Sequence, residues 1–220
     1  MAGKPALCTL TQVEKRYAAD SACVLGPLSL TVHAGEILGI RGRNGAGKST
    51  LLSILAGVLS PSAGQRVLSP RAEGHVGYVP QELSLYTSLT GVENLKFWGL
   101  AGGLPSKAIA ARSRWLLEQL DLRGKGRQAV RAYSGGMKRR LHLATALMDT
   151  PALLLLDEPT VGADQHSARL ILDMLRHLRG LGCGIVLISH QAGELESVCD
   201  RILTLENGLP ASQEGGPWED

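Results

Sequence analysis

Residues 42–49 read GRNGAGKS and match the pattern GxxxxGK[ST] at every fixed position. Glycines let the backbone wrap tightly, so that successive N–H groups can point at one anion. A strand-like run, 36–41, precedes the motif and a helical pattern, 48–58, follows it, so the positive end of a helix dipole adds to those N–H groups. Glycine is abundant, with 27 residues in the chain, but the complete motif in this setting predicts a site for the polyphosphate of a nucleotide.

Two side chains of the motif have distinct expected roles. Lys48 would supply a point charge for the β- and γ-phosphates, and the Ser49 hydroxyl is a natural Mg²⁺ ligand. We therefore expect the chain to bind ATP and Mg²⁺ and to hydrolyse the ATP. The predicted nucleotide-binding residues of this segment are Gly42, Arg43, Asn44, Gly45, Ala46, Gly47, Lys48, Ser49 and the next residue, Thr50.

Two acids, Asp157 and Glu158, follow the apolar run 153–156. A short continuous apolar run is typical of a buried strand, and beyond its end the chain can turn and present both acids to one cleft. We expect Asp157 to hold Mg²⁺, directly or through water, and Glu158 to polarise the attacking water as a general base. A surface Asp-Glu turn is a common alternative, but a phosphate loop needs an acid at a strand end for its metal.

The elements that must position these residues follow from the hydrophobic pattern. Strands are predicted over 6–13, 28–33, 36–41, 75–79, 152–157, 184–189 and 201–206. Helices are predicted over 48–58, 91–100, 106–121, 134–149, 165–179 and 192–199. Alternating strands and helices on both sides of a mostly helical block indicate an α/β fold with a parallel-sheet core and an inserted helical subdomain.

Length and composition limit the domain organisation and the class of partner. With 220 residues, of which 44% are hydrophobic, the chain can form one large domain, 1–208, with the helical subdomain over 83–150. The polar end, 209–220, is predicted to be a flexible tail. A net charge of +3 and only 4% aromatic residues disfavour a nucleic-acid partner.

The chain shows no pattern of export or membrane insertion. It has no run of eighteen apolar residues and no secretory leader, so we expect no membrane span. Its four cysteines form no CxxC pair and no cluster with zinc-ligand spacing, and are expected to be reduced core residues, which suits the cytoplasm.

A second glycine-rich helix start lies between the two motifs. Residues 133–138 read YSGGMK, with Ser134 as the predicted N-cap, and another anion site is expected there. This segment resembles the LSGGQ signature of ABC transporter ATPases. The other elements of that family occur in its order, and the resemblance covers about residues 7–208. These elements are Tyr17, the loop 42–49, Gln81 in GYVPQ, Asp157 with Glu158, the loop VGAD at 161–164, and His190 after a β-run.

The resemblance implies roles for residues around one bound nucleotide. Tyr17 would stack on the adenine, and Gln81 would contact Mg²⁺ and relay its presence to the helical subdomain. His190 would contact the γ-phosphate and keep Glu158 and the attacking water in line. On this basis Glu158, His190 and Gln81 are the predicted catalytic residues, and Ser49, Gln81 and Asp157 the predicted metal ligands.

The resemblance also implies a dimer. Two chains would pack head to tail, so that Ser134, Gly135 and Gly136 of one chain meet the γ-phosphate bound by the other, while Asp164 links the two sites. The second ATPase subunit would be a copy of this chain or a paralogue.

Four positions depart from the family pattern. Arg43 replaces the usual proline of the phosphate loop, Tyr133 and Met137 replace the signature leucine and glutamine, and Ala163 replaces a common leucine. Because the Ser-Gly-Gly core is intact, we expect activity to be retained.

The resembling segments look most like exporters whose ATPase and membrane parts are separate chains. The expected partner is a polytopic membrane permease subunit, which would hold this chain at the cytoplasmic face of the membrane. The alternative is a soluble, non-transport ABC ATPase of DNA repair or translation, which would need a coiled-coil insertion or a second cassette. A P-loop kinase or GTPase would explain neither the Ser-Gly-Gly element nor His190.

Overall fold

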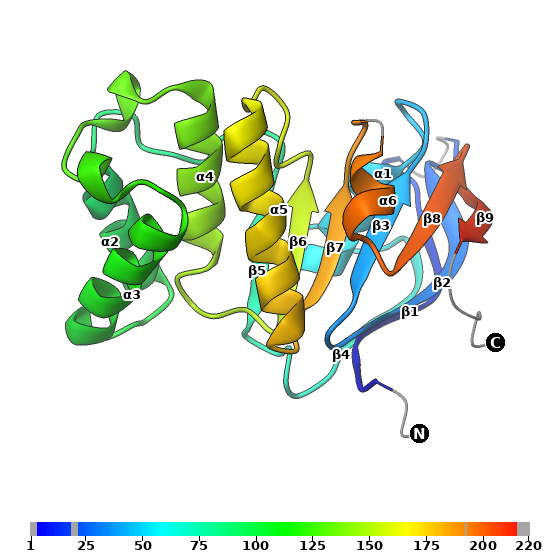
Figure 1. Cartoon of the computed structure of the whole chain (residues 1–220). Helices are drawn as coiled ribbons and strands as arrows, with labels where there is room; N and C mark the ends of the chain where they lie inside the picture. The colour runs from blue at the N-terminus through cyan, green and yellow to red at the C-terminus, as the bar shows by residue number, and fades with distance from the viewer. Residues whose placement is uncertain (1–3, 19–21, 192, 215–220) are drawn as a thin grey trace.

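The computed structural model describes residues 4–18, 22–191 and 193–214, and these form two sheets with helices around them (Figure 1). The smaller sheet is antiparallel with strand order β2-β1-β4, and the larger has the order β5-β6-β7-β3-β8-β9. The strands are β1 (Ala6–Lys15), β2 (Leu25–His33), β3 (Ile37–Arg41), β4 (Ala63–Leu68), β5 (Val76–Val79), β6 (Leu153–Asp157), β7 (Gly184–Ile188), β8 (Arg201–Glu206) and β9 (Leu209–Glu214).

The larger sheet brings three functional loops to one edge. Its strands β5, β6, β7, β3 and β8 are parallel, and only β9 runs antiparallel to its neighbour. Ile188, the last residue of β7, pairs with Ile40 of β3 and with Asp157 of β6. The three central strands therefore end level with one another, and the loops that follow them emerge side by side.

Two apolar cores lie on the two faces of this sheet. Side chains along a strand alternate between faces, so Leu154 and Leu156 of β6 belong to one core while Leu153 and Leu155 belong to the other. Because both faces are covered, β6 and β7 are buried along their whole length and read as continuous apolar runs.

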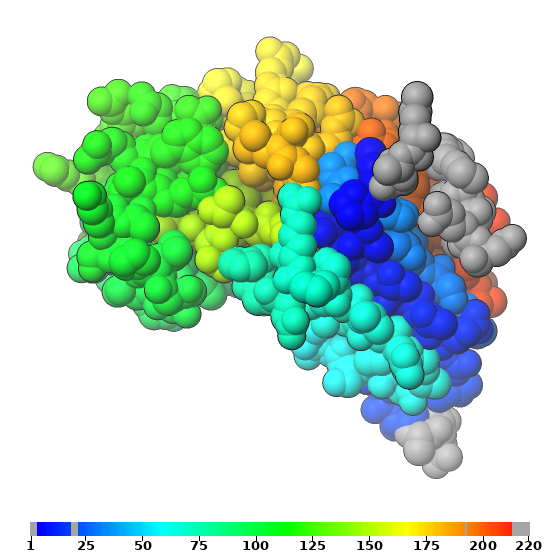
Figure 2. All heavy atoms as spheres, turned by 90° about the horizontal axis from the view of Figure 1, so that it is seen from below, coloured from blue at the N-terminus to red at the C-terminus, as the bar shows by residue number. Residues whose placement is uncertain are grey.

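The helices are distributed between these faces and one end of the molecule. The helices are α1 (Lys48–Ala56), α2 (Gly91–Ala101), α3 (Ser106–Gln119), α4 (Gly135–Ala146), α5 (Gln165–Gly180) and α6 (Glu194–Val198). Helix α1 lies on the face shared with the smaller sheet, and α5 and α6 cover the other face (Figure 1). Figure 2 shows the segment of α2–α4 at one end of the molecule and the N-terminal strands at the other. None of the helices in the described segments is long and apolar enough to cross a membrane.

The predicted α/β class, with an antiparallel sheet before the phosphate loop and helices between β5 and β6, is confirmed.

Two strands were not predicted. The first, β4, is an exposed edge strand without clear alternation. The second, β9, covers 209–214, where a flexible tail was expected. Asn207 and Gly208, with φ of 49° and 81°, form a tight turn that folds β9 back onto β8.

Two expectations fall partly outside the described residues. The helix expected over 192–199 is shorter, since α6 begins at Glu194, and Ala192 lies outside the described part of the chain. Residues 215–220 of the expected tail lie outside it as well.

Candidate functional site

The phosphate loop joins β3 to α1 and folds around the side chain of Lys48. The Nζ of Lys48 donates hydrogen bonds to the carbonyl oxygens of Gly42, at 2.9 Å, and Arg43, at 3.0 Å. Gly47 caps the helix with a φ of 91°, and a Cβ atom there would lie 2.7 Å from the carbonyl oxygen of Val24. Glycine is therefore required at this position on two counts: its positive φ and its close contact with neighbouring backbone.

Two carboxylates lie within electrostatic reach of Lys48. Burial lowers the pKa of the Lys48 ammonium, while the charges of Glu158 and Asp157 act in the opposite direction and favour the charged form. Asp157 ends β6 and is buried, and Ser49 is exposed at the start of α1. An ammonium, a hydroxyl and a carboxylate at one sheet edge are a donor set that fits a triphosphate with a hard divalent cation.

Glu158 is held between two of the other predicted residues. Its backbone has a φ of 50°, in the left-handed region that non-glycine residues seldom adopt. The Nε2 of Gln81 donates a hydrogen bond to its Oε2 at 3.3 Å, and the Nε2 of His190 lies 3.3 Å from its Oε1. The structure thus brings together the three residues that were predicted to be catalytic.

Tyr17 lies beside the phosphate loop, with its ring accessible. Its hydroxyl is 3.1 Å from Oγ1 of Thr50, and 63% of the residue is exposed. The Nζ of Lys15 lies 5.7 Å from the ring centroid. An exposed aromatic face next to a phosphate loop is the geometry that base stacking needs.

Ser134 and Asp164 cap neighbouring helices. Ser134 accepts a hydrogen bond from the N–H of Met137 at the start of α4, and Asp164 accepts one from the N–H of Ser167 at the start of α5. The bond from Ser167 is the largest cause of a lowered pKa at Asp164. A Cβ on Gly136 would collide with the Asp164 carboxylate, 2.5 Å away, so only glycine fits where these two helix starts meet.

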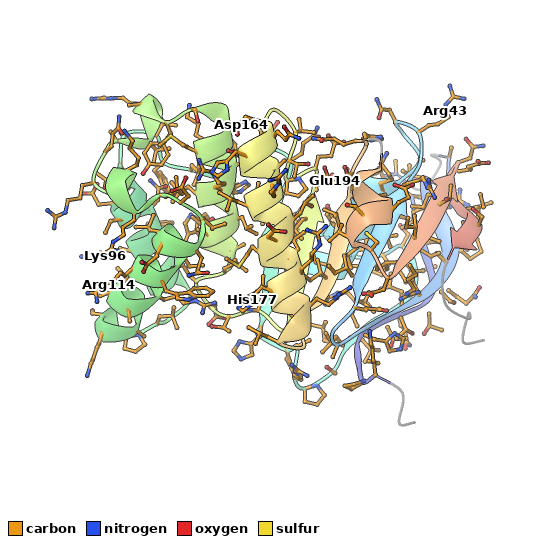
Figure 3. All side chains as sticks on the ribbon, viewed as in Figure 1. Arg43, Lys96, Arg114, Asp164, His177 and Glu194 are labelled. Carbon is orange, nitrogen blue, oxygen red and sulfur yellow. The ribbon has the colours of Figure 1, made fainter. Side chains whose placement is uncertain are left out.

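The structure does not gather all of the predicted residues around one point. Asp164 and Arg43 are both at the upper edge of the molecule in Figure 3, but well apart. Strand β7 separates β6 from β3 in the sheet, and α4 packs beyond α5, on the side of β5. Residues 134–136 are therefore separated from the phosphate loop of their own chain.

Sequence reasoning missed Arg139, which ties two of the predicted loops to α4. Its Nη1 donates to the carbonyl oxygen of Gln81 at 2.6 Å, and its Nε donates to that of Val161 at 2.9 Å. The residue follows the Ser-Gly-Gly segment by three positions, and nothing in its type or spacing distinguishes it from its basic neighbours.

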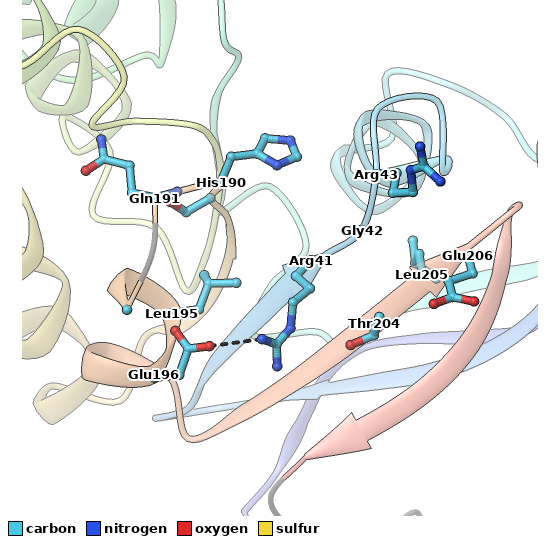
Figure 4. Close-up of a pocket in the computed structure, with 12 residues that line it drawn as sticks. Arg41, Gly42, Arg43, His190, Gln191, Leu195, Glu196, Thr204, Leu205 and Glu206 are labelled. Carbon is cyan, nitrogen blue, oxygen red and sulfur yellow. Dashed lines mark hydrogen bonds and ion pairs between the residues drawn. The ribbon is translucent and has the colours of Figure 1, made fainter.

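A cavity of about 490 Å³ lies beside the phosphate loop, between β3 and β8 on one side and the loop and helix α6 that follow β7 on the other (Figure 4). Arg41 and Glu196 form an ion pair of 2.9 Å in its wall, and His190 and Arg43 lie on its rim. Arg43, which replaces the usual proline, is exposed, so its charge adds to the surface next to the loop.

Comparisons with known proteins agree with this geometry. The family described as ABC transporter matches residues 25–161. The chain belongs to the ABC transporter family. Linearmycin resistance ATP-binding protein LnrL of Bacillus subtilis is 36% identical over 204 residues, which cover 89% of this chain and 65% of that protein. Nod factor export ATP-binding protein I of Ralstonia nicotianae is 38% identical over 225 residues, which cover 99% of this chain and 69% of that protein.

A solved structure described as the ATP binding subunit of an ABC transporter has a TM-score of 0.85 at 27% identity, over 95% of this chain and 90% of that one. The prediction that the chain is the nucleotide-binding component of an ABC transporter is confirmed. It spans about two thirds of the length of these two relatives.

Proposed function

We propose that this ABC protein is the motor subunit of an exporter, which hydrolyses ATP with Mg²⁺ and works as a dimer beneath a separate membrane subunit. The observation that carries the proposal is the position of Glu158. Its carboxylate lies between Gln81 and His190, at the sheet edge that also carries the phosphate loop.

Each of these residues has a defined task. Lys48 binds the β- and γ-phosphates, and Glu158 accepts a proton from the attacking water. His190 and Gln81 hold the Glu158 carboxylate in place from its two sides. Ser49, Gln81 and Asp157 would hold Mg²⁺, which neutralises charge on the phosphates as the γ-phosphate leaves.

The separation of residues 134–136 from their own phosphate loop supports a dimer. The N–H groups at the start of α4 form an anion site, which a phosphate bound by the same chain does not reach. A second chain packed head to tail by a two-fold axis would bring each Ser-Gly-Gly segment to the other chain's phosphate. ATP then completes the interface, and its hydrolysis weakens it.

The membrane partner is inferred from a surface and from the names of relatives. Exposed apolar side chains gather on α2 and the loop before it, where the rings of Tyr86 and Phe97 are 4.7 Å apart. Leu83 in the preceding loop and Val92 and Leu100 on α2 are exposed apolar residues as well. A cytoplasmic segment of a membrane subunit would cover it. A relative named as an export ATP-binding protein supports export, and no feature favours the non-transport alternative.

The test is Glu158→Gln in the purified chain. This variant should bind ATP, lose roughly a hundredfold or more in turnover, and remain a dimer with ATP by light scattering. Lys48→Ala should instead lose ATP binding by calorimetry, and Glu73→Gln, an exposed acid at the opposite sheet edge, should behave as the wild type. Wild-type turnover by Glu158→Gln, or its staying monomeric with ATP, would contradict the proposal.

A further inference from the structure

Glu194, the first residue of α6, is a buried acid that the proposed chemistry does not use. It is 7% exposed. Thr160, which is 0% exposed, donates a hydrogen bond from its hydroxyl to the carboxylate, and its Oγ1 lies 3.0 Å from Oε1 and 2.9 Å from Oε2 of Glu194. Burial raises the pKa of this carboxyl, and the hydrogen bonds from Thr160 and Ser189 lower it. A buried carboxylate is costly unless it is hydrogen-bonded, so these contacts constrain where α6 can lie.

The same network includes both sequence neighbours of His190. The hydroxyl of Ser189 forms a hydrogen bond with Glu194. It also accepts a hydrogen bond from the backbone N–H of Gln191 at 3.1 Å. Gln191 in turn donates from Nε2 to the carbonyl oxygen and to Oγ1 of Thr160, at 3.2 Å each. The Thr160 hydroxyl therefore accepts a hydrogen bond from Gln191 and donates one to Glu194, so it acts as donor and acceptor at once.

The network is also close to Glu158 along the chain, because Thr160 lies two residues after it. Only Pro159, with its restricted φ, separates them. Glu158 is further fixed by its N–H, which donates to the carbonyl oxygen of Ile188 at 3.0 Å. The imidazole of His190 is 38% exposed, and its distance to Glu158 depends on where the two chain segments are held.

We propose that Thr160 and Glu194 are positioning residues for hydrolysis: their buried hydrogen bond joins the segment of Glu158 to the loop of His190 and sets the contact between those two side chains. The inference rests on the proposed function, since it assigns a purpose to that contact. Neither residue reaches the phosphate loop, so both act through His190 and Glu158. Because a displacement of about 1 Å can cost a hundredfold in rate, loss of the hydrogen bond should lower turnover more than nucleotide binding.

The test uses Thr160→Val, which keeps the shape and removes the hydroxyl, with Thr160→Ser as the matched variant that restores it. In the purified chain, Thr160→Val should lower kcat about tenfold or more while the KM for ATP changes by less than about twofold. Thr160→Ser should return kcat to within about twofold of the wild type. A residue that only stabilises α6 would lower the melting temperature without this separation of kcat from KM.

A second measurement reads the contact without any turnover. In ¹⁵N-histidine-labelled chain, the Nε2 chemical shift of His190 is compared between wild type and Glu158→Gln, and again between Thr160→Val and the double variant Thr160→Val/Glu158→Gln. The difference should shrink by about half or more in the Thr160→Val background and return with Thr160→Ser. If Thr160→Val does not fold, Thr160→Val/Glu194→Leu removes the buried charge too and serves as the background.

The outcomes separate the two proposals. An unchanged His190 shift difference in the Thr160→Val background, or wild-type kcat in that variant, overturns the positioning role. Wild-type turnover by Glu158→Gln overturns the proposed function, while the chemical-shift comparison still reports whether Thr160 and Glu194 set the distance.

Discussion

Arg139 donates a hydrogen bond from Nη1 to the carbonyl oxygen of Gln81 at 2.6 Å and, through Nε, another to Val161 at 2.9 Å. One rigid guanidinium thus joins the loop that contacts Glu158, the loop that ends at Asp164, and the helix that starts with the Ser-Gly-Gly segment. Burial lowers the pKa of Arg139, while Glu158 raises it by favouring the charged form. The two halves of the proposed dimeric site are connected within one chain by this side chain.

Arg139→Met should uncouple these loops. It keeps the apolar stem but leaves the carbonyl oxygens of Gln81 and Val161 without this donor, at a cost of about 2 kcal/mol in the free energy of unfolding. We expect kcat for ATP hydrolysis to fall roughly tenfold, because Gln81 then holds Glu158 less firmly, with little change in ATP affinity. Steady-state kinetics and urea unfolding measure the two effects.

The neighbouring Lys138 provides the control. It is only partly buried, and Lys138→Met makes the same change of charge one position away. If Lys138→Met lowered kcat as much as Arg139→Met, the loss would come from charge and not from the two hydrogen bonds.

Local patterns were enough to predict the phosphate loop and the acids at the end of β6. The loop motif is a contiguous eight-residue string, and Asp157 follows an apolar run whose length matches a buried strand. The contacts among separate segments were not predictable in this way. Arg139 meets a carbonyl 58 residues away, and Thr160 meets a carboxylate 34 residues away. Each is an ordinary residue type in its own segment, and only the folded topology gives it a partner.

The same contrast applies to strands. The alternation of β1 and the apolar run of β6 mark one or both of their faces as buried, whereas β4 is mostly exposed and lacks such a pattern. Strand β9 is too polar to be recognised by hydrophobicity, although the Asn207-Gly208 pair before it is a hairpin signal that could have predicted it.

The apolar surface around Phe97 is expected to dock the membrane subunit. Phe97 is 41% exposed and packs edge to face with Tyr86 and Trp98. Aromatic anchors dominate the energetics of interfaces, so Phe97→Ser should weaken docking about tenfold. The measurement is the amount of membrane protein that co-purifies with the tagged chain from detergent-solubilised membranes. Val67→Ser, which changes a 55% exposed residue on the distant edge strand β4, should leave that amount unchanged. Equal yields from the two variants would place the docking surface elsewhere.

His142 should make folding stability depend on pH below neutrality. It lies in α4, is 2% exposed, and accepts a hydrogen bond at Nε2 from the N–H of Ser84 at 3.3 Å. Burial, with a further contribution from the positive charge of Arg139, lowers its pKa from 6.5 to about 4. Between these two values the unfolded chain binds a proton at this residue and the folded chain does not. Stability is therefore lost as the pH falls from 6.5 to 4, by an amount on the order of 3 kcal/mol.

Urea unfolding of wild type and His142→Gln at pH 7 and pH 4.5 isolates this contribution from that of the carboxylates. Glutamine does not titrate, so the variant should lose less stability than the wild type over this range, even if it is less stable at pH 7. His75→Gln makes the same substitution at a histidine whose side chain is 53% exposed, and serves as the matched control. Parallel pH profiles for His142→Gln and wild type would mean that His142 accepts its proton in the folded chain, and that its contact with Ser84 does not require a neutral ring.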